Sequence, residues 1–274
     1  MPPFAELSPP LQALVAGLGT LALTAVGAGV VVFGRLEVGA LFEAMLGFAS
    51  GVMLAAAYWS LLEPAIAISD ARGALPWLAP TVGLLAGTLF LTVADRLLPH
   101  LHPSLPAVAA EGLRTNWSTA TLLVLAITLH NIPEGLAVGV AFGAAADPGQ
   151  AALPGTPSLG AALALAVGIA LQNVPEGASV ALPLRAAGVS KTRSFLAGTA
   201  SAAVEPLAAV AGALAVGAVS GILPYALGFA AGAMIYVVLE ELIPSAHQGG
   251  RADLVTLSAI GGFALMMVLD IALG

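Results

Sequence analysis

The chain has 274 residues, of which 59% are hydrophobic and only 8% are charged, and its mean hydropathy is +1.01. Soluble domains carry about 25% charged residues, so this composition excludes a water-soluble globular protein and predicts a polytopic membrane protein in a lipid bilayer. The net charge of −7 argues against nucleic acid as a partner, and the absence of cysteine excludes disulfides and thiolate metal sites.

Eight apolar segments are long enough to cross a bilayer as helices, for which about 20 residues are needed. We predict spans at about 11–33, 41–68, 76–98, 117–146, 158–187, 193–220, 222–247 and 253–273, within a single membrane domain over residues 1–274. The predicted fold class is an all-α polytopic membrane protein, a bundle of eight transmembrane helices.

Basic residues fall almost entirely on one side of this arrangement. The loops after spans one, three, five and seven contain Arg35, Arg96, Arg114, Arg185, Lys191, Arg193 and Arg251, whereas the opposite loops contain only Arg72. Cytoplasmic loops are enriched in Lys and Arg. Both termini are therefore predicted to lie outside the cytoplasm.

Two near copies of one motif lie in the middle of spans four and five: HNIPEG at 130–135 and QNVPEG at 172–177. The prolines deprive the carbonyls of Leu129 and Leu171 of their helical hydrogen bonds, so both helices are predicted to be kinked. Because the two spans run in opposite directions, the motifs are expected to face each other across an inverted pseudo-twofold axis. Irregular helices arranged in this way are typical of transporter substrate sites.

Three acids lie deepest in the predicted spans, namely Glu134, Glu176 and Glu205, and no Lys or Arg lies at comparable depth. A carboxylate at a helix centre costs about 2.5–3.5 kcal/mol, so three cost roughly 8–10 kcal/mol. His130 lies four residues before Glu134, which places both on one helix face. Gln172 and Glu176 repeat this spacing. A cation that meets these groups is the favoured explanation, and protonated acids that serve only in packing are the alternative.

The candidate ligands are one imidazole, three carboxylates and three amides: His130, Glu134, Glu176, Glu205, Asn131, Gln172 and Asn173. This mixture fits a borderline or hard divalent ion such as zinc, iron(II), manganese or cadmium. Copper(I) would require sulfur, which only Met53 offers nearby, and calcium or magnesium would normally avoid the histidine.

Weaker candidates lie nearer the ends of the spans. Those that could line a secondary pathway are Asp95, His100, His102, Glu240, Glu241, His247 and Asp270. In span two, Ser50, Met53, Ala57 and Ser60 form a stripe of small or soft residues at helical spacing, for which packing is the simpler explanation.

These motifs resemble the ZIP (Zrt/Irt-like) family of divalent metal transporters, in its bacterial branch. The resemblance covers essentially the whole chain and includes MLGFASG at 45–51, VEPL at 204–207 and FALMMVLD at 263–270. It implies a first metal bound by His130, Glu134, Gln172 and Glu176, with Met53 nearby. It implies a second metal bound by Asn131, Asn173 and Glu205 and bridged by Glu134 and Glu176. The family often has histidine in place of Gln172 and, in some bacterial members, an acid in place of Asn173.

The resemblance also implies a role for the outlying residues. Asp270 would lie near the outer side, and Asp95, Glu240, Glu241, His100 and His102 near a cytoplasmic exit. Family members are similar in being homodimers that move metal into the cytoplasm, with spans one, four, five and six proposed to slide against the rest. The expected protein is thus a zinc transporter of the bacterial cytoplasmic membrane that works by alternating access, and not an enzyme.

Two other functions stay open from the sequence. An intramembrane metal-dependent hydrolase would need an open coordination position and a general base, and the chain has no second deep histidine for such a site. A membrane scaffold would instead be stabilised by removal of the three deep acids, without loss of activity.

Overall fold

A computed structural model describes residues 3–33, 39–99, 112–113, 115–146 and 153–273. Within these ranges the regular structure is helical and there is no strand. Among the described residues, eight helical stretches are long and apolar enough to cross a membrane: Pro9–Val32, Ala40–Ala71, Leu78–Leu97, Thr121–Ala145, Leu159–Ala186, Lys191–Ala218, Leu223–Ala246 and Ala252–Leu273. The predicted all-α polytopic fold class is confirmed, and every predicted span ends within about four residues of these bounds.

Four spans are single helices: α5 (Leu78–Leu97), α6 (Thr119–Ala145), α7 (Leu159–Ala186) and α12 (Ala252–Leu273). The others consist of shorter helices joined end to end. Span one is α1 (Pro9–Ala28) and α2 (Val30–Phe33), and span two is α3 (Ala40–Ala56), the π-helical η2 (Ala57–Leu62) and α4 (Glu63–Ala71). Span six is α8 (Lys191–Ala200), η4 (Ser201–Ala203) and α9 (Val204–Ala218), and span seven is α10 (Leu223–Val237), the π-helical η6 (Val238–Leu242) and α11 (Ile243–Ala246).

Serine side chains fix where the three central spans begin. Ser118, Ser158 and Ser190 precede α6, α7 and α8, and each side-chain oxygen accepts a hydrogen bond from the backbone N–H three residues later. Such caps satisfy one of the backbone donors that a helix start leaves free. The helices α6 and α7 then continue as α-helix through Pro133 and Pro175.

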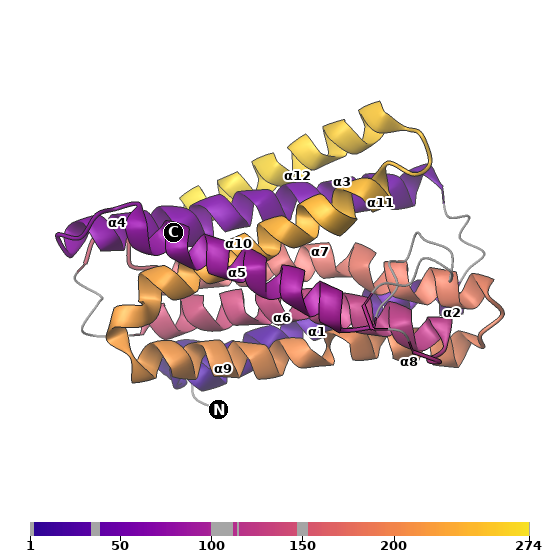
Figure 1. Cartoon of the computed structure of the whole chain (residues 1–274), viewed down its shortest axis with the longest axis horizontal. Coiled ribbons are helices and arrows are strands. Elements are labelled where there is room, and N and C mark those ends of the chain that lie inside the picture. The colour runs from indigo at the N-terminus through magenta and orange to yellow at the C-terminus, as the bar shows by residue number, and fades with distance from the viewer. Residues whose placement is uncertain (1–2, 34–38, 100–111, 114, 147–152, 274) are drawn as a thin grey trace.

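The spans form two groups of four. Helices α1, α6, α7 and α9, here called group A, pack closely together, with α1 against α7 and α6 against α9. Helices α3, α5, α10 and α12, called group B, pair as α3 with α12 and α5 with α10. In Figure 1, α3 and α12 lie along the upper side and α1 and α9 along the lower side.

This pairing agrees with the predicted inverted pseudo-symmetry. The pseudo-twofold axis relates spans one, two and three to spans six, seven and eight, and span four to span five. The contact between α1 and α7 then corresponds to the contact between α9 and α6. The contact between α3 and α12 likewise corresponds to the contact between α10 and α5, and η2 corresponds to η6. The related spans run in opposite directions, so the two motif helices of group A occupy equivalent positions.

Close backbone contacts within each group depend on glycine. A Cβ at Gly139 in α6 would collide with the backbone carbonyl of Ala209 in α9, and one at Gly87 in α5 would collide with that of Phe229 in α10. Small residues let helix backbones approach closely in a membrane, where the hydrophobic effect does not drive helices together. Each group is therefore held together by backbone-to-backbone packing.

We expect Gly139→Ala to destabilise the protein, although alanine favours an isolated helix by about 1 kcal/mol. The added methyl group faces a backbone carbonyl that cannot move aside, and overpacking of this kind typically costs about 1–3 kcal/mol. Gly217→Ala in α9 is the matched control, because a Cβ there meets nothing within 4 Å. Thermal unfolding in detergent should show a lower Tm for the first variant only, and equal Tm values would contradict this account of the packing.

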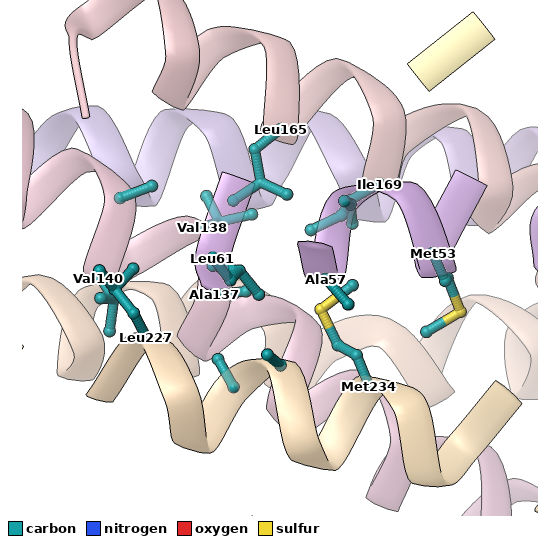
Figure 2. Close-up of a cluster of buried hydrophobic side chains, with 14 of the residues drawn as sticks. Met53, Ala57, Leu61, Ala137, Val138, Val140, Leu165, Ile169, Leu227 and Met234 are labelled. Atoms are coloured by element: carbon teal, nitrogen blue, oxygen red, sulfur yellow. The ribbon is translucent and has the colours of Figure 1, made fainter. Parts of the chain in front are cut away.

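The interface between the two groups is different in kind. It consists mainly of apolar side chains, which Figure 2 shows: Met53, Ala57, Leu61, Leu227 and Met234 from group B meet Ala137, Val138, Val140, Leu165 and Ile169 from group A. All ten are buried. Side-chain contacts of this kind lack the backbone interlocking that holds each group together.

Candidate metal centre

Three carboxylates from three helices lie in the middle of group A. Glu134 is on α6, Glu176 on α7 and Glu205 near the start of α9, and their exposed fractions are 0%, 3% and 0%. The Lys and Arg residues that the structure describes all lie in loops or near helix ends. None of them supplies a positive charge at this depth, so the cost of burial must be offset by hydrogen bonds, by protons or by a cation.

The amides of the second motif hold two of these carboxylates. Gln172 Nε2 donates to Oε1 of Glu134 at 2.8 Å. Asn173 Nδ2 donates to both oxygens of Glu205, at 2.9 Å each. These bonds connect α7 to α6 and to α9. In addition, the carboxyl groups of Glu134 and Glu176 lie close enough to interact directly.

Several buried polar atoms at this centre have no hydrogen-bond partner. They are both amide atoms of Asn131, Oε2 of Glu134, Oε1 of Gln172, Oδ1 of Asn173 and Oε2 of Glu176. Most buried polar atoms in proteins are paired, so a cluster of this kind requires an explanation. All but one of these atoms are oxygens, which are the ligands that hard and borderline divalent cations accept.

Charged and imidazole groups alone do not complete a coordination shell here. Among the described His, Asp and Glu side chains, no three are arranged so that they could hold a metal ion together. The amide oxygens of Gln172 and Asn173 would have to contribute, or His130 would have to turn. The mixed ligand set expected from the sequence, with amides beside the carboxylates and the imidazole, stays a prediction.

The ring of His130 contacts group B. Its Nε2 lies 2.6 Å from Oε1 of Glu241, which belongs to η6. A small pocket of about 10 Å³ adjoins this contact and is also lined by Asp95 and Tyr236. The volume is close to what one water molecule needs. This contact occupies one ring nitrogen and leaves Nδ1 of His130 available as a ligand, since a metal-binding histidine commonly donates its other N–H to a carboxylate.

A larger pocket lies toward the other end of the bundle. It has a volume of about 360 Å³ and is lined by residues that include Trp59, Ser60, Glu63 and Asp270. Ser60 donates to Oδ1 of Asp270 at 2.6 Å, and Oδ2 of that aspartate has no partner. The structure therefore gives Asp270 a buried, polar position beside a pocket and joins it to the serine of the predicted span-two stripe.

The remaining predicted residues fall outside these clusters. Met53 is fully buried among apolar side chains (Figure 2). Glu240 is exposed, and so is His247, whose ring nitrogen Nδ1 lies 2.9 Å from the carbonyl of Ile243 in its own helix. His100 and His102 lie outside the described residues, so their predicted role in an exit path stays a prediction.

The sequence interpretation did not foresee the two π-helical segments. They position the side chains that connect the spans: η2 carries Ser60 and η6 carries Glu241. In each segment a backbone N–H bonds to the carbonyl five residues earlier, Glu63 to Tyr58 and Ile243 to Val238. π-helical turns are rare and often occur at functional sites.

Comparison with known proteins gives a consistent result. The family model described as "ZIP Zinc transporter" matches residues 107–270. "Zinc transporter ZIP11" of Bos taurus is 40% identical over 97% of this chain and 98% of its own length. "Zinc transporter GufA" of Myxococcus xanthus is 43% identical over 79% of this chain and 81% of its own. "Zinc transporter ZIPB" of Bordetella bronchiseptica is 40% identical over 96% and 81%.

Both the matched family and these relatives are named as transporters, which confirms the prediction that the chain is not an enzyme. The predicted membership, based on the paired motifs and the eight spans, is confirmed as well. The chain belongs to the ZIP zinc transporter family of integral membrane proteins.

Proposed function

We propose that the protein moves zinc across the cytoplasmic membrane of a bacterium into the cytoplasm, by alternating access. Cadmium, iron(II) and manganese, which accept similar ligands, are further proposed substrates. The observation that carries the proposal is the convergence of three buried carboxylates from α6, α7 and α9, two of which retain an unpartnered oxygen, with no basic side chain beside them among the described residues. A divalent ion would satisfy these oxygens and offset their charge.

In this proposal Glu134, Gln172 and Glu176 bind the metal, and His130 joins them through a ring nitrogen. Met53, which the family resemblance associates with the first metal, is a proposed additional contact. We further propose homodimers, which follow from the family resemblance alone.

The two pockets lie on opposite sides of this centre along the bundle and supply a route. The described basic residues gather at the end where α5 and α7 finish and α8 and α12 begin, and only Arg72 lies at the other end. Because basic loops face the cytoplasm, we assign that end to the inside and both termini to the outside. The pocket at Asp270 is then an outer vestibule, and the pocket at Asp95 and Glu241 leads inward.

Alternating access requires two parts of the molecule to move relative to each other. The division into groups A and B supplies such parts, because many glycine contacts interlock helices within each group whereas apolar side chains form most of the interface between them. A backbone contact between the groups occurs near one end, where Gly160 of α7 meets the carbonyl of Leu273 in α12. Sliding of packed elements along side-chain interfaces is a common form of conformational change. The metal centre lies within group A and would move with it.

The direct test is uptake by proteoliposomes that contain the purified protein and a zinc indicator inside. We expect uptake that saturates with external zinc, that cadmium inhibits, and that decreases about tenfold or more from about pH 8 to about pH 5. The decrease follows because carboxylates and imidazole bind metal only when deprotonated, so protons compete with the metal.

Protein-free liposomes and liposomes with a collapsed pH gradient are the controls. They separate slow leakage and an effect of proton flux from competition at the site. Equal uptake across this pH range would contradict metal binding by the buried carboxylates, and absence of metal flux would contradict transport altogether.

A further inference from the structure

Glu205 differs from the other two buried carboxylates in how its oxygens are used. Glu134 and Glu176 each retain one oxygen without a hydrogen-bond partner. Both oxygens of Glu205 accept from the single nitrogen Nδ2 of Asn173, at equal distances of 2.9 Å. The amide nitrogen therefore lies where a cation would lie if the carboxylate of Glu205 bound it through both oxygens.

We infer that Asn173 takes the place of a second metal ion, so that the centre carries one divalent ion at a time. The inference rests on the proposed function, since it concerns how many ions the same site holds. Gln172 does not play the same part, because its amide engages only Oε1 of Glu134 and leaves Oε2 available. Glu205 is accordingly a positioning residue, which ties α9 to α7.

Charge alone does not fix the stoichiometry. The three carboxylates bring three negative charges, one more than a single divalent ion balances and one fewer than two would need. The two hydrogen bonds from Asn173 favour a single ion, because they stabilise the carboxylate of Glu205 without a second cation. Replacement of Asn173 by aspartate would both remove the amide donor and add the fourth negative charge.

The test is equilibrium dialysis of the purified full-length protein against zinc, with bound metal measured by mass spectrometry. Five proteins are compared: wild type, Asn173→Asp, Asn173→Asp with Glu205→Gln, Glu205→Gln alone, and Glu176→Gln. Zinc bound by exposed residues is the same in each protein, so it drops out when the amounts of bound zinc per chain are subtracted. We expect Asn173→Asp to bind one more zinc per chain than wild type, and the added Glu205→Gln change to remove that extra ion.

Glu205→Gln in the wild-type background covers the case in which Asn173→Asp does not fold. We expect it to bind as much zinc as wild type, because Glu205 holds no ion there. Loss of one zinc in Glu205→Gln, or no gain in folded Asn173→Asp, would overturn the inference. The Glu176→Gln protein tests the proposed function separately: it should lose one zinc, and if it binds as much as wild type, the proposed centre itself is wrong.

Discussion

Zinc uptake is expected to fall by at least about 100-fold when Glu176 is replaced by glutamine. Even residues that only support a metal ligand contribute about 10–100-fold to affinity or activity, so loss of a ligand should cost more. Glutamine keeps the shape of the side chain and removes the negative charge. In the wild type, the carboxylates of Glu134 and Glu176 would share one cation. The amide of the variant carries no charge and cannot take the place of the second carboxylate.

The same substitution should not unfold the protein. A buried carboxylate without a basic partner destabilises the metal-free fold, so its neutralisation is expected to leave the Tm unchanged or to raise it. In the presence of zinc the order should reverse, with the wild type more stable than the variant. Zinc at about 100 times its Kd would stabilise the wild type by about 2.7 kcal/mol, and this increase in stability should be absent in Glu176→Gln.

Glu6→Gln is a suitable control, because it makes the same chemical change at an exposed residue in the short helix η1 (Phe4–Glu6) before the first span. Uptake and zinc-dependent stabilisation should both match wild type in that variant. Wild-type uptake in folded Glu176→Gln protein would move the transport site away from the paired motifs.

Much of this centre could be predicted because its signal is local. The depth of Glu134 and Glu176 follows from their place in apolar runs, and the helical spacing within each motif follows from periodicity. The facing of the two motifs follows from the opposite directions of the consecutive spans four and five. These properties depend on the positions of residues along a helix, which sequence contains directly.

The partner of His130 could not be predicted in the same way. Periodicity placed His130 on the face of Glu134, yet the ring bonds to Glu241, on a span more than a hundred residues later. Which helix of group B meets α6 depends on the packing of the whole bundle, and no local pattern records it. The same holds for Ser60 and Asp270, which the sequence interpretation singled out separately but did not pair.

Prolines were an incomplete guide to helix irregularity. Kinks were predicted at Pro133 and Pro175, and the helices continue as α-helix through both residues. The π-helical segments instead end just before Pro64 and Pro244. A proline has no N–H to continue the usual bonding to the carbonyl four residues earlier, which favours a wider turn. Packing decides which prolines produce a π-helical turn, so a proline in the sequence does not by itself predict such a turn.

A covalent link between the two groups is expected to stop transport. Gly168 in α7 belongs to group A and Val52 in α3 to group B, and a Cβ at Gly168 would lie 3.5 Å from Cγ1 of Val52. This spacing suits a disulfide between Val52→Cys and Gly168→Cys. The Cβ would also meet the sulfur of Met266, the flexible end of a side chain that can move aside. Since the chain has no cysteine, the engineered thiols can react only with each other.

Uptake by the oxidised double variant should fall in proportion to its cross-linked fraction, and a reductant should restore it. The matched control is Gly143→Cys with Val216→Cys, which joins α6 to α9 within group A, where a Cβ at Gly143 lies 3.2 Å from that of Val216. Its cross-linked form should transport normally, because helices that move as one body lose nothing when they are joined. Full uptake by protein cross-linked between the groups would show that zinc passes without their relative motion, and a fixed pore would then be the better description.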